Sequence, residues 1–195
     1  LKAAVDLFGE RGLDGVSLRE VAERAGVNQA LISYHFGGKE GLFFACIEDF
    51  NLGRIETLKG VLTEPQSAED LKLRLKIFLE NVVHQCASDC RVARIILREL
   101  QTRRDNPEFF KRMLDTVSPL HKLLTEFLDR AKGKGLLKED LDTEMAGTIL
   151  LGILVHPHIS EQMIRIKFGY GIEDPRFTEA YARTALSIIL QGIAK

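Results

Sequence analysis

The sequence predicts an all-α protein, and three observations support this fold class. Apolar residues recur at three- and four-residue spacing along nearly all of the 195 residues, which is the period of an amphipathic helix. Helix caps, glycines and prolines separate these stretches, and no alternation typical of a strand extends over a useful length. Hydrophobic residues make up 45% of the chain, enough for a sizeable core. We expect about nine helices, in an N-terminal three-helix domain over 1–45 and a larger helical domain over 46–195.

A helix-turn-helix is predicted directly after a first amphipathic helix. Ser17 and Glu20 have capping-box spacing, in which the hydroxyl and the carboxylate each accept a backbone N–H, so a helix begins at Ser17. Gly26 supplies the positive φ that ends many helices. Asn28 is a favourable N-cap for a second helix, which two glycines terminate. Two helices joined by a short turn that contains glycine form a DNA-reading motif.

In such a motif the second helix enters the major groove, and its N-terminal residues meet the base edges. Asn28 and Gln29 carry amides that can both donate to and accept from adenine, while Ala30 permits close approach or touches a thymine methyl. Donors near the end of the helix suit phosphates, which fix register without reporting sequence. Alternatively, Asn28 could serve only as a cap, and His35 could be a buried residue at the helix corner. The predicted DNA contacts are Ser17, Arg19, Asn28, Gln29, Ala30, Ser33, Tyr34, His35 and Lys39.

The charge of this region argues against a large basic footprint. Residues 1–50 hold five basic and eight acidic side chains, a net charge of −3, and the whole chain has a net charge of −1. Any contact with DNA must therefore be local. The chain opens at Leu1, without methionine and inside an amphipathic pattern, so we expect that some sequence precedes it, where a basic arm could lie.

Several spaced motifs occur together near the N-terminus: Leu7-Phe8, Gly12, Ser17 to Ala22, Ala25-Gly26-Val27, Tyr34-His35-Phe36, Lys39-Glu40 and Leu42. Together they make the stretch from Val5 to Phe43 similar to the N-terminal domain of the TetR family of bacterial transcriptional regulators. The resemblance implies that the third helix reads the major groove and that the Tyr and Lys positions bind phosphate. Leu31 and Ser33 depart from the family, which more often has Thr and Tyr there. The remainder resembles a subgroup with a CecR/CerR-like C-terminal domain, through Arg98-Glu99 followed by Asn106-Pro107.

The helical pattern continues from the reading motif to the end of the chain. Caps and breakers divide it, among them the cap pair of Ser67 and Asp70. Pro157 is expected to kink the long helix that contains it. The predicted helices span 40–62, a stretch that begins at Ser67, 91–104, 107–119 with its continuation over 120–131, 142–168 and 175–193.

An effector would bind among the middle helices, in a cavity between apolar faces that carry a few polar groups. The apolar members of this set could equally be plain core. Arg98 and Glu99 could form an internal ion pair instead of contacting a ligand. The candidate ligand-binding residues are Phe78, Asn81, His84, Arg94, Arg98, Glu99, Phe110, Met113 and His121.

A regulator that reads two half-sites of a palindromic operator must be a symmetric dimer. Small residues in the last two helices permit close helix approach, either between subunits or within one chain. The resemblance to the TetR family implies that these helices pair as a four-helix bundle. The expected partners are thus double-stranded operator DNA, a second copy of the chain and a small-molecule effector. The predicted interface residues are Met145, Ile149, Gly152, Ile153, Phe177, Tyr181, Ala185 and Ile188.

Composition and missing motifs weigh against other classes of protein. Three cysteines cannot all pair within one chain, and their scarcity indicates a reducing compartment, so we expect a cytoplasmic protein. His84, Cys86 and Cys90 could converge as a metal or thiol sensor, but small buried thiols are the simpler interpretation, and no metal or cofactor is expected. No apolar run is long enough to span a membrane.

No nucleophile elbow, zincin pair, phosphate loop or dinucleotide fingerprint is present, so we do not expect an enzyme. The motifs instead predict a ligand-responsive repressor that binds DNA as a homodimer. The alternative is a helical DNA-binding regulator without a small-molecule effector, controlled by protein partners.

Overall fold

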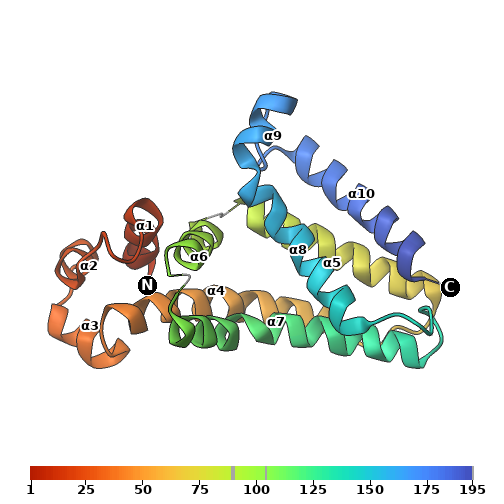
Figure 1. Cartoon of the computed structure of the whole chain (residues 1–195), viewed down its shortest axis with the longest axis horizontal. Helices are drawn as coiled ribbons and strands as arrows, with labels where there is room; N and C mark the ends of the chain where they lie inside the picture. Colours follow the sequence, from red (N-terminus) through yellow and green to blue (C-terminus); the bar gives the residue numbers. More distant parts are fainter. Residues whose placement is uncertain (89–90, 104, 195) are drawn as a thin grey trace. The chain divides into compact units, whose positions relative to one another are not determined.

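The computed structural model describes residues 1–88, 91–103 and 105–194, which form ten helices and no strand beyond one isolated bridge (Figure 1). Over this part of the chain the predicted all-α class is confirmed. The helices are α1 Lys2–Arg11, α2 Leu18–Ala25, α3 Gln29–Phe36, α4 Lys39–Val61, α5 Ala68–Ser88, α6 Arg91–Thr102, α7 Pro107–Gly133, α8 Thr143–Ile159, α9 Glu161–Phe168 and α10 Pro175–Ile193.

The helix predicted over 142–168 is in fact two helices. α8 ends at Ile159 and α9 begins at Glu161, and Ser160 between them has φ −99° and ψ 11°. Pro157 lies inside α8 and cannot donate a backbone N–H, so the ladder is already weakened before the break. The break therefore follows the proline instead of coinciding with it, and no glycine or proline marks Ser160 as a stop.

The chain divides into two compact units, each described here by itself. The first comprises Leu1–Gly53 and Arg91–Ser118. Four buried aromatic rings lie in its core, Phe8 from α1, Phe43 and Phe44 from α4 and Phe109 from α7, and the contacting pairs among them have centroids 5.2 to 5.9 Å apart. Buried aliphatic side chains of α1, α2 and α6 complete this core. Segments far along the chain thus pack against the reading motif. The boundary predicted for an N-terminal domain over 1–45 stays a prediction.

The second unit comprises the described residues of 54–90 and 119–195. Its core contains Phe78 and Leu79 from α5 and Phe127 from α7, all fully buried. α10 packs along α5. α7 continues through Pro119 without a break, as predicted, so one helix supplies side chains to both units.

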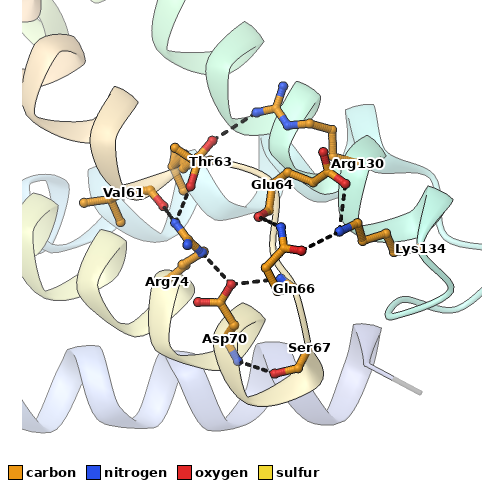
Figure 2. Close-up of polar contacts among 10 residues, drawn as sticks. Val61, Thr63, Glu64, Gln66, Ser67, Asp70, Arg74, Arg130 and Lys134 are labelled. Atoms are coloured by element: carbon orange, nitrogen blue, oxygen red, sulfur yellow. Dashed lines mark hydrogen bonds and ion pairs between the residues drawn. The ribbon is translucent and has the colours of Figure 1, made fainter.

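A group of polar contacts closes the loop between α4 and α5 in this second unit (Figure 2). The predicted cap at Ser67 is present, since its hydroxyl accepts the Asp70 N–H at 3.1 Å. The Asp70 carboxylate accepts the Gln66 N–H, and not that of Ser67, at 2.9 Å. Arg74 donates to the Asp70 carboxylate at 2.9 Å and to the Val61 carbonyl at 2.8 Å. One arginine therefore ties the end of α4 to the start of α5.

Candidate nucleic-acid interface

The capping box predicted at the start of α2 is present with both of its hydrogen bonds. The Ser17 hydroxyl accepts the Glu20 N–H at 3.2 Å, and the Glu20 carboxylate accepts the Ser17 N–H at 2.8 Å. Arg11 pairs with the same carboxylate at 2.7 Å. The Ser17 N–H, the Ser17 hydroxyl and then Arg11 hold the pKa of the Glu20 carboxyl at about 2. The start of α2 is thereby fixed.

The turn into α3 has the geometry expected of a helix-turn-helix. Gly26 ends α2 with a φ of 66°. This left-handed conformation is free of strain for glycine, which has no Cβ. The Asn28 side chain accepts the Ala30 N–H at 2.8 Å and caps α3. α3 then ends at Gly37, which also has a positive φ. The predicted cap at Asn28 is therefore confirmed, and its side-chain oxygen is engaged in the free protein.

α3 presents a polar, exposed face, and one residue anchors it. Ile32 is only 6% exposed and packs into the core of the first unit, with Phe36 partly buried beside it. Tyr34 is 83% exposed, and its ring meets that of His35 edge to face. His35 is itself exposed, so the alternative of a buried corner histidine does not hold. All but one of the predicted contact residues are exposed, and Lys39 is half-exposed. The exposed ones are Ser17, Arg19, Asn28, Gln29, Ala30, Ser33, Tyr34 and His35.

One member of this set carries a local partner. Arg19 forms an ion pair with Glu23 one turn along α2, at 2.8 Å, with both side chains in solvent. An exposed pair of this kind contributes little, so Arg19 can exchange its partner for a phosphate at small cost. Arg24 pairs with Asp6, at 3.7 Å, also within the first unit.

The candidate ligand residues are divided between the two units. Arg94, Arg98, Glu99, Phe110 and Met113 belong to the first unit, together with the reading motif. The ion pair predicted between adjacent residues is not formed: Glu99 bonds to Arg103 one turn along α6, at 2.9 Å. Successive positions point to different sides of a helix, whereas positions four apart share a face.

The other four candidates lie in the second unit. Phe78 is fully buried core, and His121 lies 3.2 Å from the Thr148 hydroxyl. Asn81 and His84 line an open cleft of about 860 Å³ between α5 and α10. The remaining lining residues, several of them charged, are Lys76, Glu80, Gln85, Thr178, Glu179, Ala182, Arg183 and Leu186.

The candidate dimer residues fall into two groups. Met145, Ile149 and Ile188 are large apolar side chains that remain mostly exposed, and Gly152 is exposed beside them. The others are covered by their own chain: Phe177 and Ala185 are buried, Ile153 and Tyr181 are half-buried, and the Tyr181 hydroxyl donates to the Ile153 carbonyl at 2.6 Å. The prediction did not include further exposed apolar residues on α8 and α9, which are Val155, Ile159, Met163, Ile166 and Phe168.

The cysteines give no support for a sensor within the described structure. Cys46 is buried and free, and burial raises the pKa of its thiol to about 11. Cys90 and the side chain of Cys86 lie outside the residues whose placement the structure describes. Among the described residues, no group of His, Cys, Asp and Glu side chains gathers as a metal site. No helix of this part of the chain has the length and apolar character needed to cross a membrane.

Comparison with known proteins gives consistent similarities. Residues 1–46 match the sequence profile of the bacterial regulatory proteins of the tetR family. The transcriptional dual regulator CecR of Shigella flexneri is 28% identical, over 100% of this chain and 91% of CecR. The transcriptional repressor AcnR of Corynebacterium glutamicum is 26% identical, over 79% of this chain and 75% of AcnR. The solved structure of the regulator FadR of Bacillus subtilis in complex with stearoyl-CoA has a TM-score of 0.79 at 22% identity, covering 98% of this chain and 96% of that one.

Proposed function

We propose that this chain, which belongs to the tetR family of bacterial regulatory proteins, is a ligand-responsive repressor that binds a palindromic operator as a homodimer. One observation supports DNA reading most directly. α3 is anchored by Ile32 and capped by Asn28, and its exposed polar side chains are those of Gln29, Ser33, Tyr34 and His35. Such a helix can enter the major groove without first unfolding or losing a core contact.

Two kinds of contact are proposed for this face. Gln29, with a free amide at the first turn of α3, reads a base edge, while Tyr34 and Lys39 bind phosphates. Gln29→Ala should relax preference at one base pair. Lys39→Ala should weaken all duplexes nearly equally and reduce the salt slope by about one unit.

Single-base variants of a duplex that the unaltered protein selects from a randomised pool provide the test. Lys72→Ala, which removes an exposed lysine of α5, is the matched control and should bind as the unaltered protein does. Equal loss of specificity in the Gln29 and Lys39 variants would contradict the two roles. Failure to select any duplex would contradict DNA reading itself.

The homodimer is proposed from the exposed apolar side chains of α8 and α10. Ile188 on α10 and Ile149 on α8 would leave water if a second copy covered them, and exposed apolar surface of this kind marks interaction sites. Ile188→Arg should yield monomers in sedimentation analysis. Leu73→Arg is the matched control, since Leu73 is 53% exposed and lies on α5, outside the predicted interface. A monomeric unaltered protein at micromolar concentration would contradict the proposal.

Control by a small molecule is proposed for the second unit. The solved FadR is a regulator in complex with stearoyl-CoA, and in this chain the cleft between α5 and α10 is concave and contains the predicted residues Asn81 and His84. α4 and α7 each run from one unit into the other, so an effector has two continuous helices through which to act on the reading motif.

Thermal-shift screening with a panel that includes stearoyl-CoA should identify a ligand whose stabilisation is lost in Asn81→Leu but kept in Lys72→Ala. A coupling of about 3 kcal/mol would change DNA affinity roughly 100-fold, and DNA must then weaken the ligand by the same factor. Equal ligand affinity with and without the selected duplex would instead favour a regulator controlled by protein partners.

A further inference from the structure

The first unit contains a buried carboxylate that was predicted to bind a ligand but that forms hydrogen bonds with groups of the chain itself. Glu99, on α6, is only 2% exposed. One of its oxygens accepts the backbone N–H of Leu13 at 2.9 Å, and the other accepts Nε of Arg103 at 2.9 Å. Removing a carboxylate from water is costly unless it is paired and hydrogen-bonded. Here both oxygens are engaged, and one of them holds a backbone group 86 positions earlier in the chain.

The same turn of the chain is held at further points. Arg103 bonds to the Asp14 carboxylate at 2.5 Å as well as to Glu99, and an Arg98 nitrogen lies 3.4 Å from the Glu10 carbonyl. At Gly12 the backbone has φ 75°, and a Cβ there would lie 3.3 Å from the carboxylate of Glu99. α6 therefore approaches the turn between α1 and α2 so closely that a side chain at residue 12 would crowd it.

This turn sets the entry into the reading motif. Leu13 and Val16 are buried within it, and Ser17 follows at once as the cap of α2. α2 in turn packs against α3. A displacement of the Leu13 backbone is thus passed to α2 through the four residues 14–17 and to α3 through helix packing.

We propose that Glu99 is a positioning residue for DNA recognition: by holding the Leu13 backbone it fixes the orientation of α2 and α3, although it touches no DNA. The proposal rests on the proposed function of α3 as the reading helix. Two variants of Glu99 distinguish the loss of its charge from the loss of its hydrogen-bond acceptor. Glu99→Gln keeps an acceptor for the Leu13 N–H but loses the charge that pairs with Arg103. Glu99→Leu loses both and leaves the Leu13 N–H and the guanidinium without their shared partner.

The experiment measures the affinity of each variant of the whole chain for a duplex selected by the unaltered protein and for an unrelated duplex. Amide hydrogen exchange at Leu13 is measured in the same variants without DNA. Glu99→Leu should bind the selected duplex about tenfold to a hundredfold more weakly, as expected for loss of a buried charged partner. Binding to the unrelated duplex should change little, because phosphate contacts dominate it. The Leu13 amide should exchange faster, and Glu99→Gln should restore most of both losses.

Ile95→Val is the matched control, because Ile95 is also buried on α6 but contributes packing only. It should bind the selected duplex as the unaltered protein does. An equal loss in this variant, or full affinity in Glu99→Leu, would overturn the proposal. If Glu99→Leu does not fold, Glu99→Asp takes its place, because the shorter side chain withdraws the acceptor from the Leu13 N–H. Unchanged affinity and unchanged Leu13 exchange in Glu99→Asp would overturn the proposal too. Failure of the unaltered protein to select a duplex would count against DNA reading, and Leu13 exchange alone would then decide whether Glu99 holds the turn.

Discussion

Replacing Gly147 by alanine should destabilise the chain, whereas the same change at Gly152, on the same helix, should stabilise it. Alanine in place of a helical glycine gains about 1 kcal/mol, since the unfolded chain then has less backbone freedom to lose. At Gly147, however, the new methyl would lie 2.7 Å from Cγ2 of Thr125 and 3.3 Å from Nε2 of His121. Overpacking in a well-packed region costs about 1–3 kcal/mol, so the balance at Gly147 is a loss of up to about 2 kcal/mol.

At Gly152 the corresponding methyl meets no atom of the described residues within 4 Å, so the helix gain should remain. For a chain of this length 1 kcal/mol corresponds to a shift of about 2–4 °C in Tm, so the two variants should move in opposite directions. Gly152 also belongs to the predicted dimer interface. If α8 pairs closely across the dimer, the methyl at this position should weaken self-association even though it stabilises the single chain.

Thermal unfolding and sedimentation equilibrium, carried out on both variants, separate these effects. A higher Tm for Gly147→Ala would refute the close approach of α7 and α8 as the reason for glycine there. Unchanged self-association in Gly152→Ala would refute a close contact at this position, while leaving the exposed apolar residues of α10 as a separate test of the dimer.

Three further predictions concern the capping box, the buried thiol and the loop before α5. The Glu20 carboxyl, with a pKa of about 2 against an ordinary 4.5, should stabilise the chain above about pH 4.5 and lose that contribution as the pH falls towards 2; a stability gap to Glu20→Gln that stays constant over this range would contradict it. Cys46 should react with iodoacetamide near neutral pH only when the chain unfolds, because burial raises the pKa of its thiol to about 11, and peptide mapping would reveal any faster labelling. Arg74→Met should lower the free energy of unfolding, since it leaves the Val61 carbonyl and the Asp70 carboxylate without a shared donor. In chemical denaturation Lys72→Met should be near neutral, and equal effects of the two changes would contradict this role of Arg74.

Features that depend on neighbours in the chain could be predicted from the sequence. The caps at Ser17 and Asn28 and the stop at Gly26 each involve partners within four residues, and the structure has all of them. The break at Ser160 could not be predicted, because serine is not a typical stop residue and Pro157, three residues earlier, lies inside α8.

Contacts between distant segments could not be predicted from the sequence either. Glu99 looked like a partner of Arg98 or of a ligand, but its hydrogen-bond partner Leu13 lies in another part of the chain and contributes only a backbone N–H. A backbone group has no residue type and therefore leaves no signal in the sequence. Asn81 and His84, by contrast, both line the cleft between α5 and α10, and their role in binding a ligand stays a prediction.

The discontinuous first unit has a consequence for synthesis on the ribosome. Chains generally begin to fold from the N-terminus as they emerge. The core of this unit needs Phe109 from α7 and the buried residues of α6, which are made only after the whole of α5. A nascent chain that ends within α5 therefore exposes apolar side chains of α1 and α4 that the finished protein covers. For the same reason, a chimaera that transplants residues 1–45 alone onto another regulator would lack the core residues that α6 and α7 supply, whereas one that also transfers α6 and the start of α7 would carry them.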